Sequence, residues 1–228
     1  MDTRTENPGP ISCRQCDLNA ICRLTGLDAL KDTRSRSAAG SLRKVAAGKA
    51  LFRAGTPAMA LFAIRQGTVK LARITTEGDE RVESFHVPGD VLGLEAFSAE
   101  AYACDAIALD TVQYCELPLP SLESSEPRTA AIANELVRLL SKSMSRTHLA
   151  RGTIRHRVTN FLQDLSKRLS QRGLDGTHLK LAMSRLEIAN LLDTRIETVS
   201  RVLQQLHRER AILIRGSRVL VRRFAVTS

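Results

Sequence analysis

The sequence predicts an α+β protein in which an antiparallel β-barrel or jelly roll precedes a long helix and a winged helix-turn-helix. Three observations support this order: glycines about one hairpin apart in the first half, an apolar stripe at helical spacing after Pro127, and two helix-start patterns in the last third. We expect four segments: a cysteine-rich segment at 1–25, a β-roll at 26–123, the long helix at 124–151 and the winged helix-turn-helix at 152–228.

The barrel prediction rests on short segments of strand character separated by turn residues. ALFAI (60–64), TVKLARI (68–74) and RVESFHV (81–87) alternate or carry β-branched and aromatic residues. CDAIALDTVQYCEL (104–117) is treated as one further strand. Turns are indicated by glycines at a spacing typical of short antiparallel strands: Gly48, Gly55, Gly67, Gly78 and Gly89.

The long helix begins after the barrel, where Ser124 or Ser125 can cap it and Pro127 fits its first turn. Its apolar stripe could lie on the barrel or pair with a second copy of the chain, as in a coiled coil. A second amphipathic helix follows over 154–169 and ends near Gly173. We expect a dimer seam formed by Ile132, Leu136, Leu140 and Met144.

Two capping-box patterns predict the helix-turn-helix. Ser184 with Glu187 and Thr194 with Glu197 have this spacing, and they imply two helices joined by a tight turn around Asp193. The second helix should bury an apolar stripe of Ile196, Val199, Leu203 and Leu206.

The segment ILIRGSRVLVRR (212–223) predicts a basic hairpin, or wing, around Gly216-Ser217. Its arginines would face phosphates: Arg215, Arg218, Arg222 and Arg223.

Charge is distributed unevenly along the chain, whose net charge is +10. Residues 146–228 hold 17 Lys/Arg against 6 Asp/Glu, whereas residues 1–145 hold 17 against 18. A basic domain beside a neutral one favours a polyanion such as DNA as partner, although an ordinary solvated face is the alternative. Glu197 and Arg201 could then read one G·C pair in the major groove, or they could form only a cap and an ion pair.

The remaining composition excludes several classes of protein. A hydrophobic fraction of 43% with 25% charged residues is typical of a soluble globular protein. No secretory signal and no run of eighteen apolar residues is visible, so we expect a cytoplasmic protein with reduced thiols and no membrane partner. An enzyme is not indicated, because there is no nucleophile with a matching base, no Gly-rich phosphate loop and no H-E-x-x-H.

Three of the five cysteines, Cys13, Cys16 and Cys22, fall within ten positions. In a reducing compartment such a group is more typical of a metal or cluster site than of disulfides. Thiolates bind both iron–sulfur clusters and zinc, so the spacing leaves these two open beside unrelated free thiols.

The order of barrel, long helix and winged helix-turn-helix, with ETVSR at 197–201, resembles the CRP/FNR family of bacterial transcription regulators, whose barrel is cyclic-nucleotide-binding-like. The C-x2-C-x5-C spacing resembles the FNR branch, as do four further pieces. These are LFRAG (51–55), AIRQGTVK (63–70), FHVPGDVLG (85–93) and CELP (115–118).

The resemblance implies a homodimer that senses oxygen through a 4Fe-4S cluster held by Cys13, Cys16, Cys22 and Cys115. It also implies inverted TTGAT-type DNA sites and RNA polymerase as a further partner. Glu197, Ser200 and Arg201 match the E-x-x-S-R of the family. The full set expected to contact DNA is Arg195, Glu197, Ser200, Arg201, Gln204 and Arg218.

Several alternatives remain beside this interpretation. Cys104 competes with Cys115 as fourth ligand, but its parity along the strand is opposite to that of Leu117. A zinc- or thiol-based redox regulator would use the same cysteines. A cyclic-nucleotide regulator would need an arginine near Tyr102-Ala103, and none lies between Arg81 and Pro127.

Two further hypotheses about function each account for only one part of the sequence. A haem sensor could use His86 as an axial ligand, and a purely architectural DNA-binding protein would leave the barrel unexplained. Asp17, next to Cys16, would add negative charge beside a cluster and change its potential and oxygen lability.

Overall fold

The computed structural model describes residues 10–26, 42–120, 129–144 and 152–222. The chain divides into two compact units, residues 1–73 with 85–144 and residues 74–84 with 145–228. Within the described ranges, no helix combines the length and apolar character needed to cross a bilayer.

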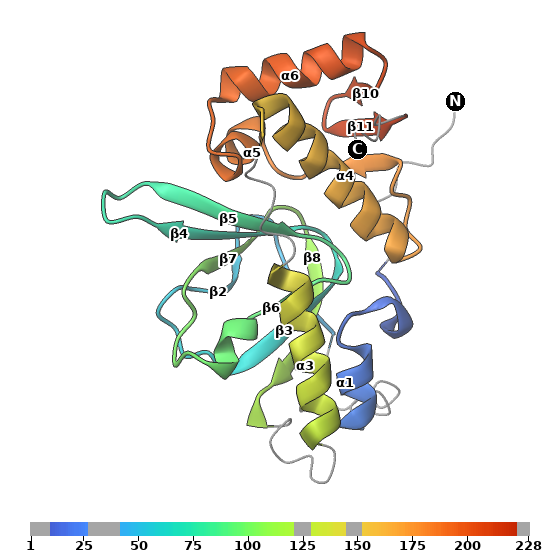
Figure 1. The fold of residues 1–228 in the computed structure, drawn as a ribbon. Helices are drawn as coiled ribbons and strands as arrows, with labels where there is room; N and C mark the ends of the chain where they lie inside the picture. Colours follow the sequence, from blue (N-terminus) through green and yellow to red (C-terminus); the bar gives the residue numbers. More distant parts are fainter. Residues whose placement is uncertain (1–9, 27–41, 121–128, 145–151, 223–228) are drawn as a thin grey trace. The chain divides into compact units, whose positions relative to one another are not determined.

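The strands of the first half form two four-stranded antiparallel sheets, which confirms the predicted jelly roll (Figure 1). The five glycines expected at turns all have positive φ, between 76° and 95°, a conformation that costs glycine least. One sheet has the order β1 (Leu42–Val45), β8 (Val112–Pro118), β3 (Ala60–Gln66), β6 (Val91–Leu92), and the other β2 (Ala50–Phe52), β7 (Asp105–Ala108), β4 (Val69–Ile74), β5 (Glu80–His86).

Residues 104–117 form two strands instead of the single one expected. β7 ends at Ala108 and β8 begins at Val112, so the turn between them breaks the parity that linked Cys104 to Leu117. Cys104 is buried just before β7. The parity argument against Cys104 was therefore wrong, and the position of each cysteine has to be judged from the fold.

Aromatic side chains fill the interior between the two sheets. The rings of Phe52 and Tyr102 stack with centroids 4.0 Å apart, and Phe62 lies 5.1 Å from Phe52 and 5.9 Å from Tyr114. The buried Tyr102 hydroxyl donates to the Ala60 carbonyl at 2.8 Å and accepts from the Ala60 N–H at 3.1 Å. Stacking and hydrogen bonding together fix this ring inside the barrel.

A second apolar core joins the N-terminal segment, the barrel and helix α3 (Thr129–Met144). The N-terminal segment contains the 3-10 turn η1 (Cys13–Gln15) and helix α1 (Asn19–Leu24). α1 lies along α3 (Figure 1), and both pack against β3 and β8 through Leu18, Ile21, Leu61, Leu117, Ile132 and Leu139.

The expected dimer seam on α3 needs correction. Ile132 is only 4% exposed and belongs to the core of its own chain, and Leu136 is partly buried against the same core. Leu140 and Met144 are exposed by 40% and 72%, and Val137 joins them at 61%. Two apolar faces share this helix, and sequence spacing alone merged them into one stripe.

The second half contains a long helix, a helix-turn-helix and a small sheet. α4 (Ile154–Gln171) is followed by Gly173 at positive φ, as expected, and Thr153 caps its start. The predicted wing hairpin is present and gains a third strand in the order β10-β11-β9, because β9 pairs with β11. The remaining elements are β9 (His178–Lys180), α5 (Arg185–Leu191), α6 (Ile196–Arg208), β10 (Ile212–Arg215) and β11 (Arg218–Val221).

One of the two predicted capping boxes forms. Glu187 N donates to Ser184 Oγ at 3.1 Å while Ser184 N donates to Glu187 Oε2 at 2.8 Å, so α5 begins as expected. Asp193 adopts the left-handed φ of 47° that the turn requires. The N-cap of α6, however, is Arg195 without a side-chain cap bond, so the box expected for Thr194 is wrong.

The buried stripe of α6 also differs at its first position. Ile196 is 38% exposed, and the buried side chains are Val199, Val202, Leu203 and Leu206. Three of the four predicted positions are therefore buried as expected, and Val202 takes the place of Ile196.

Candidate functional site

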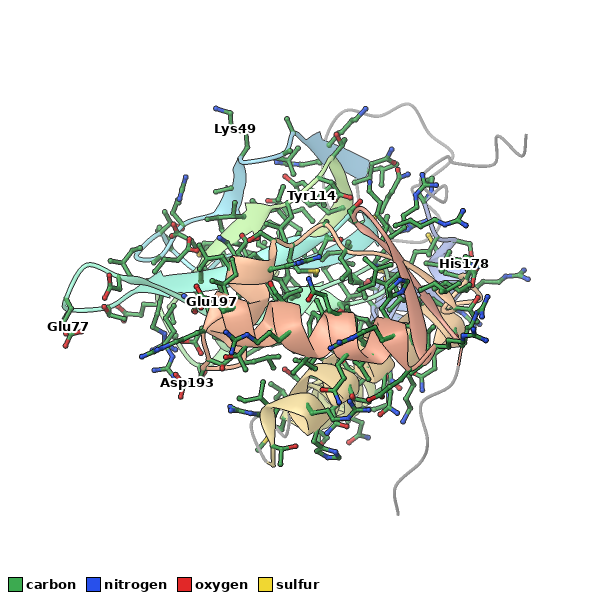
Figure 2. The ribbon with its side chains drawn as sticks, turned by 90° about the horizontal axis from the view of Figure 1, so that it is seen from above. Lys49, Glu77, Tyr114, His178, Asp193 and Glu197 are labelled. Atoms are coloured by element: carbon green, nitrogen blue, oxygen red, sulfur yellow. The ribbon has the colours of Figure 1, made fainter. Side chains whose placement is uncertain are left out.

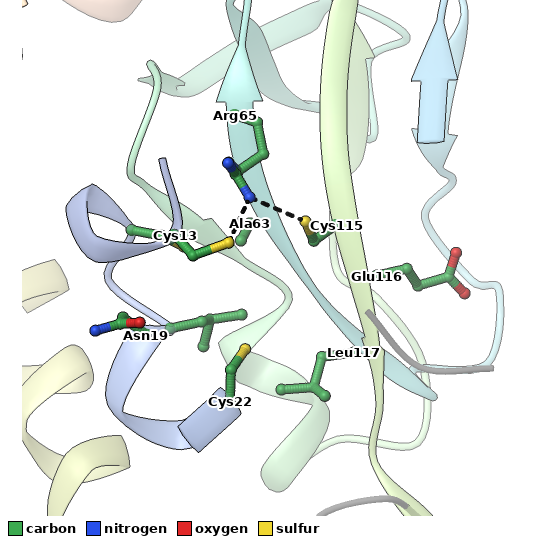
Figure 3. Close-up of a pocket in the computed structure, with 10 residues that line it drawn as sticks. Cys13, Asn19, Cys22, Ala63, Arg65, Cys115, Glu116 and Leu117 are labelled. Carbon is green, nitrogen blue, oxygen red and sulfur yellow. Dashed lines mark hydrogen bonds between the residues drawn. The ribbon is translucent and has the colours of Figure 1, made fainter. Parts of the chain in front are cut away.

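Four cysteines line one small pocket at the side of the barrel (Figure 3). Cys13 comes from η1, Cys16 ends that turn, Cys22 comes from α1 and Cys115 from β8. Cys104 does not line the pocket. The fold thus brings together the four cysteines that the resemblance implied, although Cys115 is about ninety residues away from the others in sequence.

The N-terminal segment is held against the barrel mainly through backbone hydrogen bonds. Ile11 N donates to the Arg65 carbonyl at 2.9 Å, and Asp17 N donates to the Gly89 carbonyl at 3.3 Å. Gln15 Oε1 accepts from both the N–H and the hydroxyl of Ser12 at 2.8 Å, which closes η1 as a capping box. These contacts position Cys13 and Cys16 facing β8.

Arg65 is a pocket residue that the sequence analysis missed. Its Nη1 donates to the sulfur of Cys13 at 3.1 Å and lies 3.7 Å from the sulfur of Cys115 (Figure 3). Burial opposes its charge, but the electrostatic attraction and hydrogen bonds to the sulfurs of Cys115 and Cys13 raise the pKa of the guanidinium above its usual value. Arg65 lies at an irregularity of β3, because the pairing with β8 shifts between Ile64 and Gln66. Strand alternation in the sequence therefore gives no signal for its place beside Cys115.

Burial also controls the state of the thiols. Desolvation raises the pKa of Cys16 to about 12, with the neighbouring Cys22 and Cys115 adding to the shift and a backbone hydrogen bond from Leu18 opposing it. At neutral pH this thiol is protonated, so it is a poor nucleophile by itself. A bound metal would be needed to hold it as a thiolate.

The donor set fits a group with four sulfur ligands. All five cysteines are described and none is in a disulfide. Across the described ranges, no three His, Cys, Asp or Glu side chains are placed to hold a metal ion as they stand. The sulfurs around one zinc ion would each lie about 2.3 Å from it. Here the four thiols line one pocket, a donor set that fits either a zinc ion or an iron–sulfur cluster.

An ion pair joins the cysteine segment to α3. Lys142 Nζ lies 3.0 and 2.8 Å from the two carboxylate oxygens of Asp17, which is almost completely buried. From its position in the sequence, Asp17 was expected to add negative charge beside a cluster and to change its potential and oxygen lability. Lys142 compensates that charge, so the carboxylate has a structural role in linking the two elements.

The second half presents the residues expected to contact DNA on α6 and the wing. Glu197, Arg201 and Gln204 are exposed along one face of α6, and Figure 2 shows Glu197 near the start of that helix. Arg195 at the N-cap and Arg218 in the wing are also exposed.

Other residues of this surface differ in exposure or lie outside the description. Ser200 is partly buried, and its Oγ accepts from Arg185 Nη1 at 3.4 Å. Arg215 and Arg222 are exposed beside the wing hairpin, and Arg223 lies outside the described residues.

The barrel interior around Tyr102 is filled by packed aromatic side chains. Tyr102 stands where the family resemblance would place nucleotide contacts, and its ring is stacked on Phe52 with its hydroxyl bonded to Ala60. His86, considered above as a haem ligand, is buried. Its Nδ1 lies 3.9 Å from a carboxylate oxygen of Asp90.

Comparison with known proteins places these two halves in one family. Residues 42–124 match the cyclic nucleotide-binding domain family, and residues 156–225 match the Crp-like helix-turn-helix domain family. The chain is 32% identical to the transcriptional activator protein anr of Pseudomonas aeruginosa over 217 residues, covering 91% of this chain and 87% of that protein. This chain therefore belongs to the CRP/FNR family of transcription regulators, which are not enzymes.

Further similarities to regulators extend over most of each chain. Identity is 31% to the transcriptional activator protein FnrA of Stutzerimonas stutzeri, covering 92% of this chain and 88% of that one. It is 28% to the fumarate and nitrate reduction regulatory protein of Escherichia coli, covering 92% and 86%. The structure of FixK2 from Bradyrhizobium japonicum superposes with a TM-score of 0.72 at 25% identity, covering 82% and 94%.

Proposed function

We propose that this regulator responds to oxygen through a 4Fe-4S cluster held by Cys13, Cys16, Cys22 and Cys115. The observation that carries the proposal is the convergence of four thiols, from three separate elements, on one pocket. A bound cluster would supply oxygen-labile redox chemistry and a covalent link between the N-terminal segment and β8. The similarity to the fumarate and nitrate reduction regulatory proteins supports the same assignment.

The path from this pocket to DNA affinity would run through α3. Ile21 of α1 packs in the same core as Ile132 and Leu139, so release of the N-terminal segment would change the surroundings of α3. We infer that the exposed face formed by Val137, Leu140 and Met144 pairs with a second copy of this chain. Regulators of this family bind DNA and act as dimers, and a change at that seam would alter their assembly.

The DNA target that we propose is an inverted repeat of TTGAT type, read in the cytoplasm by Glu197, Ser200 and Arg201 of two α6 helices. The exposure of Glu197 and Arg201 one turn apart supports this reading. Arg195, Gln204 and Arg218 would complete the contacts to the duplex, and RNA polymerase would be the further partner at promoters.

The test is iron and sulfide analysis of anaerobically purified protein, together with its absorption spectrum. Four irons and four sulfides per chain are expected for a 4Fe-4S centre. We expect Cys13→Ser, Cys16→Ser, Cys22→Ser and Cys115→Ser each to lose the cluster. Cys104→Ser is the matched control and should retain it, because Cys104 does not line the pocket.

Two results would overturn the assignment. Colourless protein that contains one zinc per chain would favour a zinc-based regulator that uses the same cysteines. Loss of the cluster in Cys104→Ser, with retention in Cys115→Ser, would show that the fourth ligand is wrong.

A further inference from the structure

The guanidinium of Arg65 forms hydrogen bonds to groups on both sides of the sulfur pocket. Its Nε donates to the Ile11 carbonyl at 2.7 Å, and Nη2 donates to the same oxygen. Its Nη1 is the atom that approaches both Cys13 and Cys115 (Figure 3). One side chain therefore touches the N-terminal segment, a cysteine of that segment and the cysteine of β8.

We propose that Arg65 is a positioning residue of this centre that holds Cys13 opposite Cys115 and sets the redox potential of the group bound there. The proposal rests on the function proposed above, because it assumes that the pocket holds a cluster. It goes further by assigning a residue that is not itself a ligand and by predicting how that residue changes the properties of the centre.

The shape of the guanidinium explains why an arginine is needed here. Its planar fork carries five N–H donors in fixed directions, so it can address one carbonyl and two sulfurs at the same time. A lysine ammonium would bring the same charge to the pocket but could not maintain all of these contacts. Loss of the fork and loss of the charge can therefore be separated by experiment.

The charge and the hydrogen bonds act on redox properties in the same direction. Reduction adds negative charge to a thiolate-bound cluster, and a cation with N–H donors at the sulfurs stabilises the more negative state. Arg65 is half-buried, where such interactions are stronger than in water. Removing Arg65 should therefore lower the reduction potential and make oxidation by oxygen easier.

A purely structural role for Arg65 is the competing explanation. Ile11 N also bonds to the backbone carbonyl of Arg65, at 2.9 Å, and this contact does not need the side chain. The N-terminal segment thus retains an anchor in Arg65 variants. A residue that only anchors the segment would change cluster content, but it would leave the potential of the clusters that do form unchanged.

The experiment compares Arg65→Lys and Arg65→Gln with the parent protein, each loaded with iron and sulfide under anaerobic conditions. The matched control is Arg53→Gln, which removes an exposed barrel arginine paired with Asp105. Midpoint potential and the rate at which the cluster absorbance decays in air are measured. We expect a lower potential and a several-fold faster decay for Arg65→Gln, a smaller shift for Arg65→Lys, and no change for Arg53→Gln.

The outcomes separate this inference from the proposed function. If the parent binds no cluster, the proposed function fails, and the Arg65 inference fails with it. If the parent binds a cluster but both Arg65 variants keep its potential and decay rate, only the Arg65 inference is wrong. Should Arg65→Gln assemble no cluster, an unchanged potential in Arg65→Lys would refute the inference, and a lowered one would support it. An equal shift in Arg53→Gln would attribute the effect to net charge and also refute it.

Discussion

At the scale of single residues, we expect the exposed face of α6 to carry contacts that specify a DNA sequence and the wing to carry contacts that only position the protein. Glu197 and Arg201 are exposed one turn apart, and the N-cap at Arg195 leaves Glu197 without the capping role first expected for it. Glu197 still lies in the first turn of α6, where an acidic side chain suits the helix dipole. We therefore propose acceptance from a base edge as an additional role, which the following binding experiment tests.

We expect Arg201→Ala to cost about 1–3 kcal/mol on a TTGAT-type site and to relax the preference for its G·C pair. Arg222→Ala, beside the wing, should weaken binding to all sequences alike and reduce the salt slope by about one. Anaerobic binding is measured on the site and on one with the G·C pair inverted, at several salt concentrations. If Arg201→Ala weakens both duplexes equally and changes only the slope, Arg201 contacts phosphate alone.

At the scale of secondary-structure elements, α3 is the element that links the sulfur pocket to the expected dimer seam. One face packs on α1 and the barrel through Ile132 and Leu139, and the other exposes Val137, Leu140 and Met144. The Asp17–Lys142 pair adds an electrostatic link between the cysteine segment and the last turn of the same helix.

Lys142→Met should destabilise the first unit because it leaves the buried Asp17 carboxylate without its main counter-charge. We expect a loss of about 2–3 kcal/mol, below the range for a fully buried pair, because the Lys142 side chain is 30% exposed. The double variant Asp17→Asn with Lys142→Met should recover most of this loss, since it removes both charges. Urea unfolding of the parent, Lys142→Met, Asp17→Asn and the double variant gives the coupling energy. A double variant that loses as much stability as the two single variants together would exclude the pair as an energetic link.

Leu140→Glu should convert the protein into a monomer. A carboxylate at a seam between two identical helices would face its own copy without a counter-charge, which costs several kcal/mol. Met59→Glu is the control, because Met59 is also an exposed apolar side chain of the first unit but lies on the barrel just before β3. Anaerobic light scattering should give a monomer for the first variant and a dimer for the second. A dimer in both would place the interface elsewhere.

At the scale of the whole molecule, the sequence predicted those features that depend on local patterns. Turn glycines, the Ser184 capping box and the Gly216-Ser217 hairpin are decided by neighbouring residues, and each appeared where expected. The contact of Arg65 with two sulfurs depends on strand register, and the two faces of α3 depend on what packs against each. Such features depend on which strands and helices pack together. That packing cannot be read from the spacing of residues in a single sequence.

The four cysteines of the sulfur pocket were named from the sequence, but the residues that position and balance them were not. The resemblance indicated Cys115 through the short piece CELP, while the parity argument for the same residue failed because two strands replaced one. Asp17 was noticed for its charge, yet its partner Lys142 lies 125 residues away, too far for any local pattern to suggest it.

Oxygen response and dimerisation should be linked in the whole protein, because an inverted repeat requires two α6 helices at half-sites about 34 Å apart. A monomer can engage only one half-site and loses the avidity of the second. If air acts by weakening the α3 seam, air-exposed protein and anaerobic Leu140→Glu should bind the inverted repeat equally weakly. Both should bind an isolated half-site as well as the anaerobic parent does.

Affinity for the full and half sites is measured by titration, with light scattering on the same samples. Air-exposed protein that stays dimeric but loses the full site would show that oxygen acts on the spacing of the two helices and not on assembly.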